Sequence, residues 1–297
     1  MSAEPTPRPD TKVTTQTFQE KKARGEPITM LTAYDYGTAA AMDRAGIDSI
    51  LVGDTLGMVV LGYESTLPVT MEDMLHHCRA VARGAQRALL IGDMPFMSYQ
   101  ASTADAVRNA GRFLQEAGME AVKLEGGRDR AEAVAAIVSA GIPVVGHLGL
   151  TPQSVNQLGG FRTQGRSAEA ALRLVQDALL LQQAGCFALV LESIPRRLGS
   201  LVSRRLEIPT IGIGAGLDCD GQVLVTHDLL GMFDRFTPRF VKQYAQFHQL
   251  MESAFTEYLE DVHNRRFPSK EHTFSMSDEA WEALQRALEE NMGDAEI

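Results

Sequence analysis

The stretch AVKLEGGRDRAEAVAAIVSAGIPVVGHLG, residues 121–149, places one Ala-rich segment between two short apolar runs. The runs AVKLEGG and PVVGHLG have the composition of buried strands, and DRAEAVAAIVSAG has that of a helix ending near Gly141, where a left-handed cap is expected. Two parallel strands cannot be joined by a tight turn and need a helical crossover of this kind. The stretch therefore predicts a strand–helix–strand unit.

The same alternation runs through most of the chain. Eight apolar runs are each followed by a helical or short connecting segment: ITMLTAYD, SILVGD, LLIGDMP, AVKLEGG, PVVGHLG, ALVLES, TIGIGAG and GQVLVTHDLLGM. Eight such units can close into a (β/α)₈ TIM barrel of the α/β class, and an open doubly wound sheet is the competing architecture. We predict the barrel, with a short N-terminal helix in TTQTFQEKKARG and a C-terminal helical extension.

The predicted domain boundaries follow changes in composition. Residues 1–13 are polar and contain proline, so we expect a flexible N-terminus; residues 14–274 form one barrel, the catalytic domain; residues 275–297 form an acidic tail. In the tail, Trp281, Leu284 and Leu288 have helical spacing behind a candidate N-cap at Ser277. A short amphipathic helix and a solvated tail both fit this pattern.

The composition disfavours several classes of partner. Lys and Arg total 28 against 38 Asp and Glu, and the net charge of −10 disfavours nucleic acid and anionic membranes. No apolar run approaches the roughly 20 residues of a membrane span, and MSAEPTPRPDTK lacks the apolar core of a signal peptide. The spacing of Cys78, Cys186 and Cys219 indicates neither disulfides nor zinc. We expect a cytoplasmic protein with small-molecule partners.

Ionisable residues gather at the ends of the predicted strands. In VKLEGG, Lys123 and Glu125 stand two residues apart and share one face of a strand. The neighbouring runs add four more residues: Asp54, Asp93, His147 and Glu192. Taken singly, each residue suits a helix cap, a salt bridge or a core hydrogen bond. Together they would meet at the carboxyl rim of a barrel, where barrel enzymes build their active sites.

Three carboxylates at one rim require a compensating charge. We predict that Asp54, Asp93 and Glu125 hold Mg²⁺ or a similar hard cation, because all three offer oxygen ligands. Such a centre can bind a 2-oxo acid and stabilise its enolate. Glu192 is the predicted base, because its strand position directs it into the same cavity and it is not committed to the metal. Lys123 is expected to hold the substrate carboxylate or keto oxygen.

Two glycine-rich stretches are less specific. IGIGAG, Ile211–Gly216, lacks the spacing of a dinucleotide fingerprint and favours a close approach of backbone to ligand. GGFRTQGR, Gly159–Arg166, combines glycines with polar side chains ahead of a helix. It fits either a mobile lid or a surface loop.

At these positions the sequence resembles the ketopantoate hydroxymethyltransferases of pantothenate biosynthesis. The matching segments occur in family order between about Thr14 and Phe274: TAYD, LVGDTLGM, STLPVT, GDMPFMSY, VKLEGG, GHLGLTPQSVN, GGFRTQGR, LVLE, IPTIGIGAG and DGQVLVTHDLLG. Such a set is far more specific than any one glycine pattern. The first ten residues and the tail after Phe274 lie outside it.

The resemblance implies a fold, an assembly and a reaction. The family is a (β/α)₈ barrel of the phosphoenolpyruvate/pyruvate superfamily, usually a homodecamer of two pentameric rings, with one Mg²⁺ per subunit. Its members transfer a hydroxymethyl group from 5,10-methylenetetrahydrofolate to 3-methyl-2-oxobutanoate. The product is 2-dehydropantoate (ketopantoate), in the first committed step of pantothenate and coenzyme A biosynthesis.

The resemblance also implies roles for the residues around the metal. Asp54 in VGDTLGM and Asp93 in GDMPF correspond to metal ligands that also lie against the substrate, and Glu125 in KLEGG corresponds to the third metal position. Thr55 stands where the family often has serine, and it keeps the hydroxyl donor toward the substrate at slightly greater bulk.

Three further residues correspond to groups that act on the oxo acid. Lys123 contacts it, His147 in GHLGL faces it or supports the residues that do, and Glu192 in LVLE matches the proton acceptor. In the implied reaction, Glu192 removes the C3 proton and the enolate attacks the methylene carbon of the folate. Water then completes the hydroxymethyl group as tetrahydrofolate leaves.

Three alternatives stay open from the sequence. Lys123 could form a Schiff base with the oxo group, as in metal-independent barrel aldolases. A metal-dependent carbon–carbon lyase acting on a small 2-oxo acid would use the same site without folate. A catalytically silent barrel would be expected to have lost a site residue, and the sequence keeps all of them.

Overall fold

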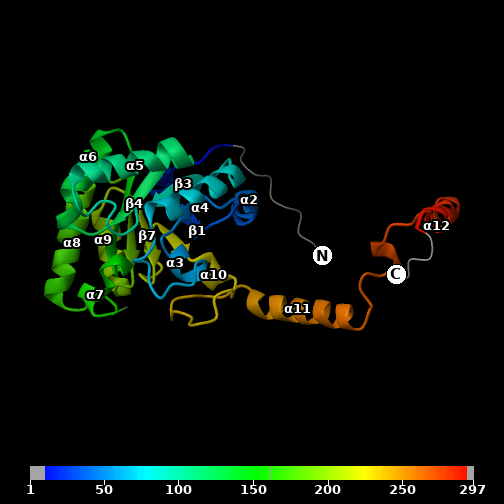
Figure 1. Ribbon diagram of the computed structural model, residues 1–297. Coiled ribbons are helices and arrows are strands. Elements are labelled where there is room, and N and C mark those ends of the chain that lie inside the picture. Colours follow the sequence, from blue (N-terminus) through cyan, green and yellow to red (C-terminus); the bar gives the residue numbers. More distant parts are fainter. Residues whose placement is uncertain (1–10, 161, 293–297) are drawn as a thin grey trace. The chain divides into compact units, whose positions relative to one another are not determined.

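The apolar runs form parallel strands in the computed structural model, which describes residues 11–160 and 162–292 (Figure 1). Within these residues the strands are β1 (Ile28–Thr32), β2 (Ser49–Val52), β3 (Leu89–Asp93), β4 (Ala121–Glu125), β5 (Val144–Gly149), β6 (Ala188–Glu192), β7 (Thr210–Ile213) and β8 (Gly221–Leu224). They pair in chain order, and β8 pairs with β1 to close a barrel. The predicted barrel is confirmed, and the open sheet is excluded.

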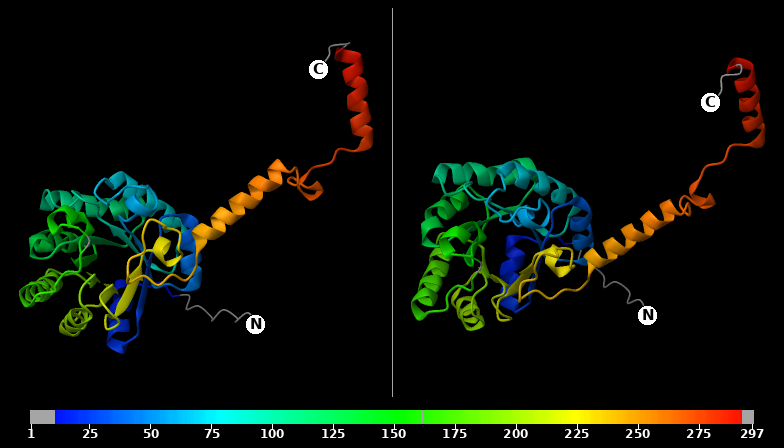
Figure 2. Two further views of the ribbon diagram at one scale, coloured as in Figure 1. Left: turned by 90° about the horizontal axis from the view of Figure 1, so that it is seen from below. Right: turned by 60° about the horizontal axis from the view of Figure 1, so that its bottom comes forward.

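Helices surround the strands (Figures 1 and 2). Those of the barrel region are α1 (Thr15–Arg24), α2 (Tyr36–Ala45), α3 (Leu56–Val59), α4 (Met71–Gly84), α5 (Thr103–Ala117), α6 (Ala131–Ser139), α7 (Val155–Leu158), α8 (Ala168–Gln183), α9 (Arg196–Arg205) and α10 (Thr226–Leu229). Side-chain N-caps begin several of them, for example Ser102 at α5 and Ser167 at α8. A short connection without a helix joins β7 to β8.

Two apolar layers hold this architecture together. One lies between the strands and the helices, and includes the fully buried Phe113 of α5 and Leu181 of α8. The other fills the barrel interior with inward-facing strand residues such as Ile91 and Val190. Alternation along each strand serves both layers, because successive side chains point to opposite faces.

The N-terminal helix α1 packs onto the barrel interior. Phe18 is fully buried in the interior layer, with its ring centroid 5.8 Å from that of Phe187. Before the helix, Val13 is buried and Lys12 Nζ lies 2.7 Å from a Glu120 carboxylate oxygen. Residues 1–10 of the segment predicted to be flexible lie outside the described residues.

The chain divides into two compact units, residues 1–245 and 246–297. The second contains α11 (Phe247–His263), the 3₁₀ turn η3 (Lys270–His272) and α12 (Asp278–Met292), so α11 belongs to this unit rather than to the barrel unit. Ser277 Oγ accepts a hydrogen bond from the Ala280 amide at the start of α12, as expected of the predicted cap. No described helix is both long and apolar enough to span a membrane. The predicted boundary at 274 stays a prediction.

Candidate active site

A cavity of about 580 Å³ opens at the carboxyl ends of the strands. All the predicted site residues line it: Asp54, Thr55, Asp93, Lys123, Glu125, His147 and Glu192. We call the part formed by Asp54, Asp93, Lys123, Glu125, His147 and Glu192 the inner end. Strand ends position them, because Asp93, Glu125 and Glu192 are the last residues of β3, β4 and β6.

Strand register determines the contacts of the inner end. Asp93 stands beside Lys123 in the β3–β4 ladder, and Glu125 stands beside His147 in the β4–β5 ladder. Accordingly Lys123 Nζ lies 2.8 Å from Asp93 Oδ1, and His147 Nδ1 lies 3.4 Å from Glu125 Oε1 and 3.3 Å from Lys123 Nζ. The parity of VKLEGG thus places both of its charges in the cavity, as predicted.

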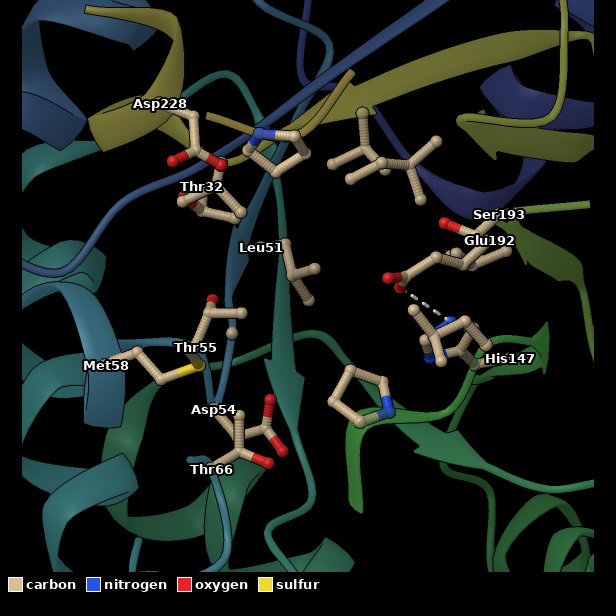
Figure 3. Close-up of a pocket in the computed structure, with 18 of the residues that line it drawn as sticks. Thr32, Leu51, Asp54, Thr55, Met58, Thr66, His147, Glu192, Ser193 and Asp228 are labelled. Carbon is tan, nitrogen blue, oxygen red and sulfur yellow. Dashed lines mark ion pairs between the residues drawn. The ribbon is translucent and has the colours of Figure 1, made fainter. Parts of the chain in front are cut away.

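His147 connects this cluster to Glu192. Its Nε2 atom lies 3.2 Å from Glu192 Oε2, and Figure 3 shows the two side chains together on one side of the cavity. The backbone of Glu192 is fixed by its carbonyl, which accepts a hydrogen bond from the Leu150 amide at 2.9 Å. Gly149 lies directly over that carbonyl at φ +101°, where an added Cβ would collide with it. Position 149 therefore requires glycine.

Asp54 and Thr55 follow β2 and bring backbone and hydroxyl groups into the cavity. The Asp54 backbone N–H donates to Asp93 Oδ2 at 3.1 Å, which fixes the Asp93 carboxylate relative to the backbone of Asp54. The hydroxyl of Thr55 lies 2.8 Å from that of Tyr34. The threonine at this position is therefore held by a buried tyrosine.

Sequence reasoning missed Gln153, which supports two of the predicted metal ligands. Its Nε2 donates to Asp54 Oδ2 at 2.9 Å, and its backbone N–H donates to Glu125 Oε2 at 3.0 Å. Tyr99 supports it in turn, since the Tyr99 hydroxyl donates to Gln153 Oε1 at 2.7 Å and accepts from the Glu125 amide. Gln153 lies in the short 3₁₀ turn η2 (Pro152–Ser154) and Tyr99 in a loop, and strand parity gives no signal at either place. The one signal for them in the sequence was their position inside the family motifs GDMPFMSY and GHLGLTPQSVN.

The inner end is electrostatically unbalanced. Burial and the neighbouring carboxylates raise the pKa of Asp54 well above its usual range, and burial together with Glu125 raises that of Asp93. Burial alone would lower the pKa of Lys123, but the carboxylates around it raise it. The surrounding carboxylates therefore favour the ammonium form of Lys123.

His147 and Glu125 shift each other in opposite directions. Burial and the Lys123 ammonium lower the pKa of His147, but Glu125 and Glu192 outweigh them and raise it to about 9. Burial raises the pKa of Glu125, but His147 and Lys123 outweigh it and lower the value. With His147 protonated, four carboxylates face two cationic side chains.

The donor set fits a hard divalent cation. A divalent ion would offset the repulsion between carboxylates that raises the pKa values of Asp54 and Asp93, and all the predicted ligands are oxygen donors. Asp93 Oδ1 and Glu125 Oε1 are buried atoms without a hydrogen-bond partner in the described part of the chain, although each lies near a cationic nitrogen. As the side chains stand, no three His, Cys, Asp or Glu residues among those described form a closed ligand group.

The outer part of the cavity is mainly apolar. We call Asp228, Phe233, Phe236 and Phe240 the outer wall; all four line the cavity. Phe233 and Phe236 meet edge to face at 5.4 Å, and the Phe240 ring lies against Gly214, where an added Cβ would come within 2.8 Å of it. The stretch IGIGAG thus meets an aromatic ring of the chain itself at Gly214.

The loop GGFRTQGR reaches the same cavity. Arg162 and Thr163 line it, and the Gln164 amide donates to the carbonyl of Ser193 at 2.9 Å. Ser193 follows Glu192 with φ +48°, a strained conformation for a residue with a side chain. The loop is therefore anchored beside the predicted base.

Comparisons with known proteins agree with this arrangement. The description of the ketopantoate hydroxymethyltransferase family matches residues 12–270. The chain belongs to this family. The 3-methyl-2-oxobutanoate hydroxymethyltransferase of Syntrophus aciditrophicus is 59% identical over 263 residues, covering 89% of this chain and 97% of that protein. That of Enterococcus faecalis is 56% identical over 273 residues, covering 92% of this chain and 99% of the relative. The resemblance inferred from the motifs is confirmed.

Solved structures of more distant proteins share the fold of this ketopantoate hydroxymethyltransferase family member. A phosphonopyruvate hydrolase matches with a TM-score of 0.60 at 13% identity, covering 95% of this chain and 99% of the other. A phosphonopyruvate hydrolase complex with oxalate and Mg²⁺ matches with a TM-score of 0.58 at 12% identity, covering 93% and 98%. At such low identity these likenesses show the barrel fold alone.

Proposed function

We propose that this protein transfers a hydroxymethyl group from 5,10-methylenetetrahydrofolate to 3-methyl-2-oxobutanoate, giving 2-dehydropantoate. Family membership supports the reaction, and the gathering of the predicted site residues in one cavity supports the mechanism. The observation that carries the proposal is that Glu192, paired with His147, lines the same cavity as Lys123, whose ammonium group suits a 2-oxo acid.

Glu192 is the proposed base that removes the C3 proton. It is the least buried carboxylate of the inner end, with 16% of its side chain exposed against 2–3% for Asp93 and Glu125. It therefore faces the space that a substrate enters. His147, 3.2 Å from Glu192 Oε2, orients the carboxylate toward the cavity.

Lys123 is the proposed anchor of the oxo acid. Its ammonium group is buried with Asp93, and its charge suits either the carboxylate or the keto oxygen of the substrate. A Schiff base would require a neutral amine, and the raised pKa of Lys123 disfavours one. This argument favours the ionic role over the aldolase alternative.

Asp54, Asp93 and Glu125 are the proposed ligands of Mg²⁺ or a similar cation. When bound, such an ion would supply Lewis-acid stabilisation of negative charge on the keto oxygen. Gln153 holds Asp54 through its side chain and Glu125 through its backbone, so it fixes the spacing of two of the three ligands. Thr55 supplies a hydroxyl beside them.

The substrate constrains the order of the later steps. After a new bond forms at C3, that carbon carries no proton, so a folate nitrogen attached through the methylene group could not leave by elimination. Water must therefore release the one-carbon unit from nitrogen as formaldehyde before the enolate adds to it. Hydrolysis breaks the carbon–nitrogen bonds of the folate, the enolate then forms the new carbon–carbon bond to formaldehyde, and the resulting alkoxide takes up a proton. This order differs from the direct attack expected above.

The remaining features of the proposal concern location and assembly. Cys78, Cys186 and Cys219 are free thiols, which suits the reducing cytoplasm. The exposed apolar side chains of α11, including Phe255 and Leu259, suit burial in a homo-oligomer such as the family decamer.

Proton NMR tests the proposed reaction directly. The purified protein with Mg²⁺, 3-methyl-2-oxobutanoate and methylenetetrahydrofolate should produce a new hydroxymethyl signal that a control without folate lacks. The lyase alternative predicts cleavage products of a 2-oxo acid in that folate-free control. Cleavage there, or no hydroxymethyl signal in the complete mixture, would refute the proposal.

A further inference from the structure

Asp228 is a carboxylate in the cavity that the inner end does not use. It lies in α10, just after β8, with only 9% of its surface exposed. Within the described residues, no hydrogen bond or ion pair reaches its side chain, and burial is the only cause that raises its pKa, to about 6. Figure 3 places it beside Thr32, on the opposite side of the cavity from Glu192 and His147.

The surrounding backbone holds Asp228 firmly. Thr226 donates through its amide to Thr32 Oγ1 at 3.1 Å and through its hydroxyl to the Thr32 carbonyl at 2.6 Å. The His227 ring packs against Tyr34 at 5.4 Å between centroids. A buried carboxylate without a partner is costly to the fold. Its fixed position at the cavity surface therefore indicates a partner that arrives with a ligand.

The cavity limits the chemistry of that ligand. An oxo acid would be repelled by Asp228, because both are anionic, and Lys123 at the inner end offers it the opposite charge. Asp228 requires N–H donors instead. The rest of the outer wall consists of Phe233, Phe236 and Phe240, which suit a flat ring. The ligand is thus a planar heterocycle with donors along one edge.

We infer that Asp228 binds the pterin ring of the folate cosubstrate, accepting hydrogen bonds from its 2-amino group and N3–H while the ring lies against the phenylalanines of the outer wall. This inference rests on the proposed function and deepens it. The two adjacent donors match the two oxygens of one carboxylate, as in other paired contacts to carboxylates. Asn at this position would turn an amide NH₂ toward a donor.

Calorimetric titration with tetrahydrofolate tests the contact apart from turnover. Asp228→Asn should weaken binding roughly 10- to 100-fold, the range for lost hydrogen bonds to a charged group. Asp234→Asn is the matched control, because Asp234 is an exposed carboxylate on the same segment and is not a lining residue. It should bind tetrahydrofolate as the wild type does.

The ligand can be altered as well as the protein. The 2-desamino-2-methyl analogue of tetrahydrofolate lacks the amino donor and should bind the wild type more weakly. When the analogue is combined with Asp228→Asn, the fold-loss in affinity should be smaller than the product of the two separate fold-losses, because both changes remove the same contact. Binding of the analogue by the wild type can be measured even if the Asp228→Asn variant does not fold.

Three results would overturn the assignment: unchanged binding by Asp228→Asn, unchanged binding of the analogue by the wild type, or fully multiplicative losses. Retained deuterium exchange at C3 of the oxo acid in Asp228→Asn would show that the inner end is intact. A wild type that bound no tetrahydrofolate and formed no hydroxymethyl product would refute the proposed function, and the inference with it. Failure of the Asp228 contact with wild-type transfer intact would leave the proposed function standing.

Discussion

The inner end and the outer wall handle buried charge in opposite ways. At the inner end, Lys123 and His147 each lie within 3.4 Å of a carboxylate oxygen, and strand register sets the pairs. On the outer wall, Asp228 has no hydrogen-bond or ion-pair partner for its carboxylate among the described residues, and three phenylalanines line the cavity with it. Paired charges define a preformed site, whereas a solitary one indicates that the ligand completes it.

Glu192→Gln should abolish hydroxymethyl transfer, with a loss of about 10²- to 10⁴-fold, the usual contribution of a general base. The amide keeps the shape of the side chain but cannot accept the proton. Steady-state assays measure the loss, and calorimetry should find binding of the oxo acid and Mg²⁺ retained. Glu207→Gln, on an exposed loop, is the matched control. Turnover equal to that of the wild type would remove Glu192 from the base role.

Lys123→Met should destabilise the fold by about 3–5 kcal/mol, because it leaves Asp93 buried without its partner. Denaturant unfolding in metal-free buffer measures this change. The control is Lys12→Met. The side chains of Lys12 and its partner Glu120 are each 36% exposed, so this variant should lose at most about 1 kcal/mol of folding stability. Equal losses in the two variants would contradict the pairing described for the inner end.

Asp228→Asn should stabilise the protein, in contrast to Lys123→Met. The folded-state pKa of Asp228, about 6, lies above its ordinary value of 3.8, so the stability it contributes is present below pH 4 and lost as the pH rises through 6. At pH 8 the variant should gain up to about 3 kcal/mol, given 1.36 kcal/mol per pKa unit. Unfolding at pH 5 and pH 8 checks this. A gain that does not shrink at pH 5 would contradict the assignment.

Gln153→Met should weaken Mg²⁺ binding by about 10- to 100-fold, because residues that support metal ligands have effects of this size. The substitution removes the side-chain donor to Asp54 and leaves the backbone donor to Glu125 in place. Gln100→Met is the control, since Gln100 donates to Gln153 at 3.0 Å and, within the described residues, makes no hydrogen bond to a carboxylate of the inner end. Equal Mg²⁺ affinity in the three proteins would exclude this supporting role.

The contrast between the inner end and the outer wall also explains which site residues could be predicted from the sequence alone. Strand alternation and parity predict the barrel and direct Lys123, Glu125 and Glu192 into one cavity, because both follow from local geometry. Gln153 and Tyr99 lie outside the strands, in a 3₁₀ turn and a loop whose conformations depend on the folded barrel, so no periodic pattern predicts their roles. Asp228 is one acidic residue among many in the sequence. Its lack of a partner emerges only when the surrounding side chains are in place.

The boundary of the barrel also shows the limit of periodic patterns. The stretch FVKQYAQFHQLMESAFTEYLEDVH has the composition of a helix, and α11 begins at Phe247, in the second compact unit. The helical pattern identifies the helix, because its composition is local. It does not identify which unit the helix joins, since that depends on tertiary contacts.

The inner end should activate the oxo acid independently of the outer wall. Proton NMR of 3-methyl-2-oxobutanoate in heavy water, with the wild type and Mg²⁺ but no folate, tests this independence. The C3 proton signal should disappear by exchange, with no hydroxymethyl signal until methylenetetrahydrofolate is added. A C3 signal that persists until folate is added would contradict the claim.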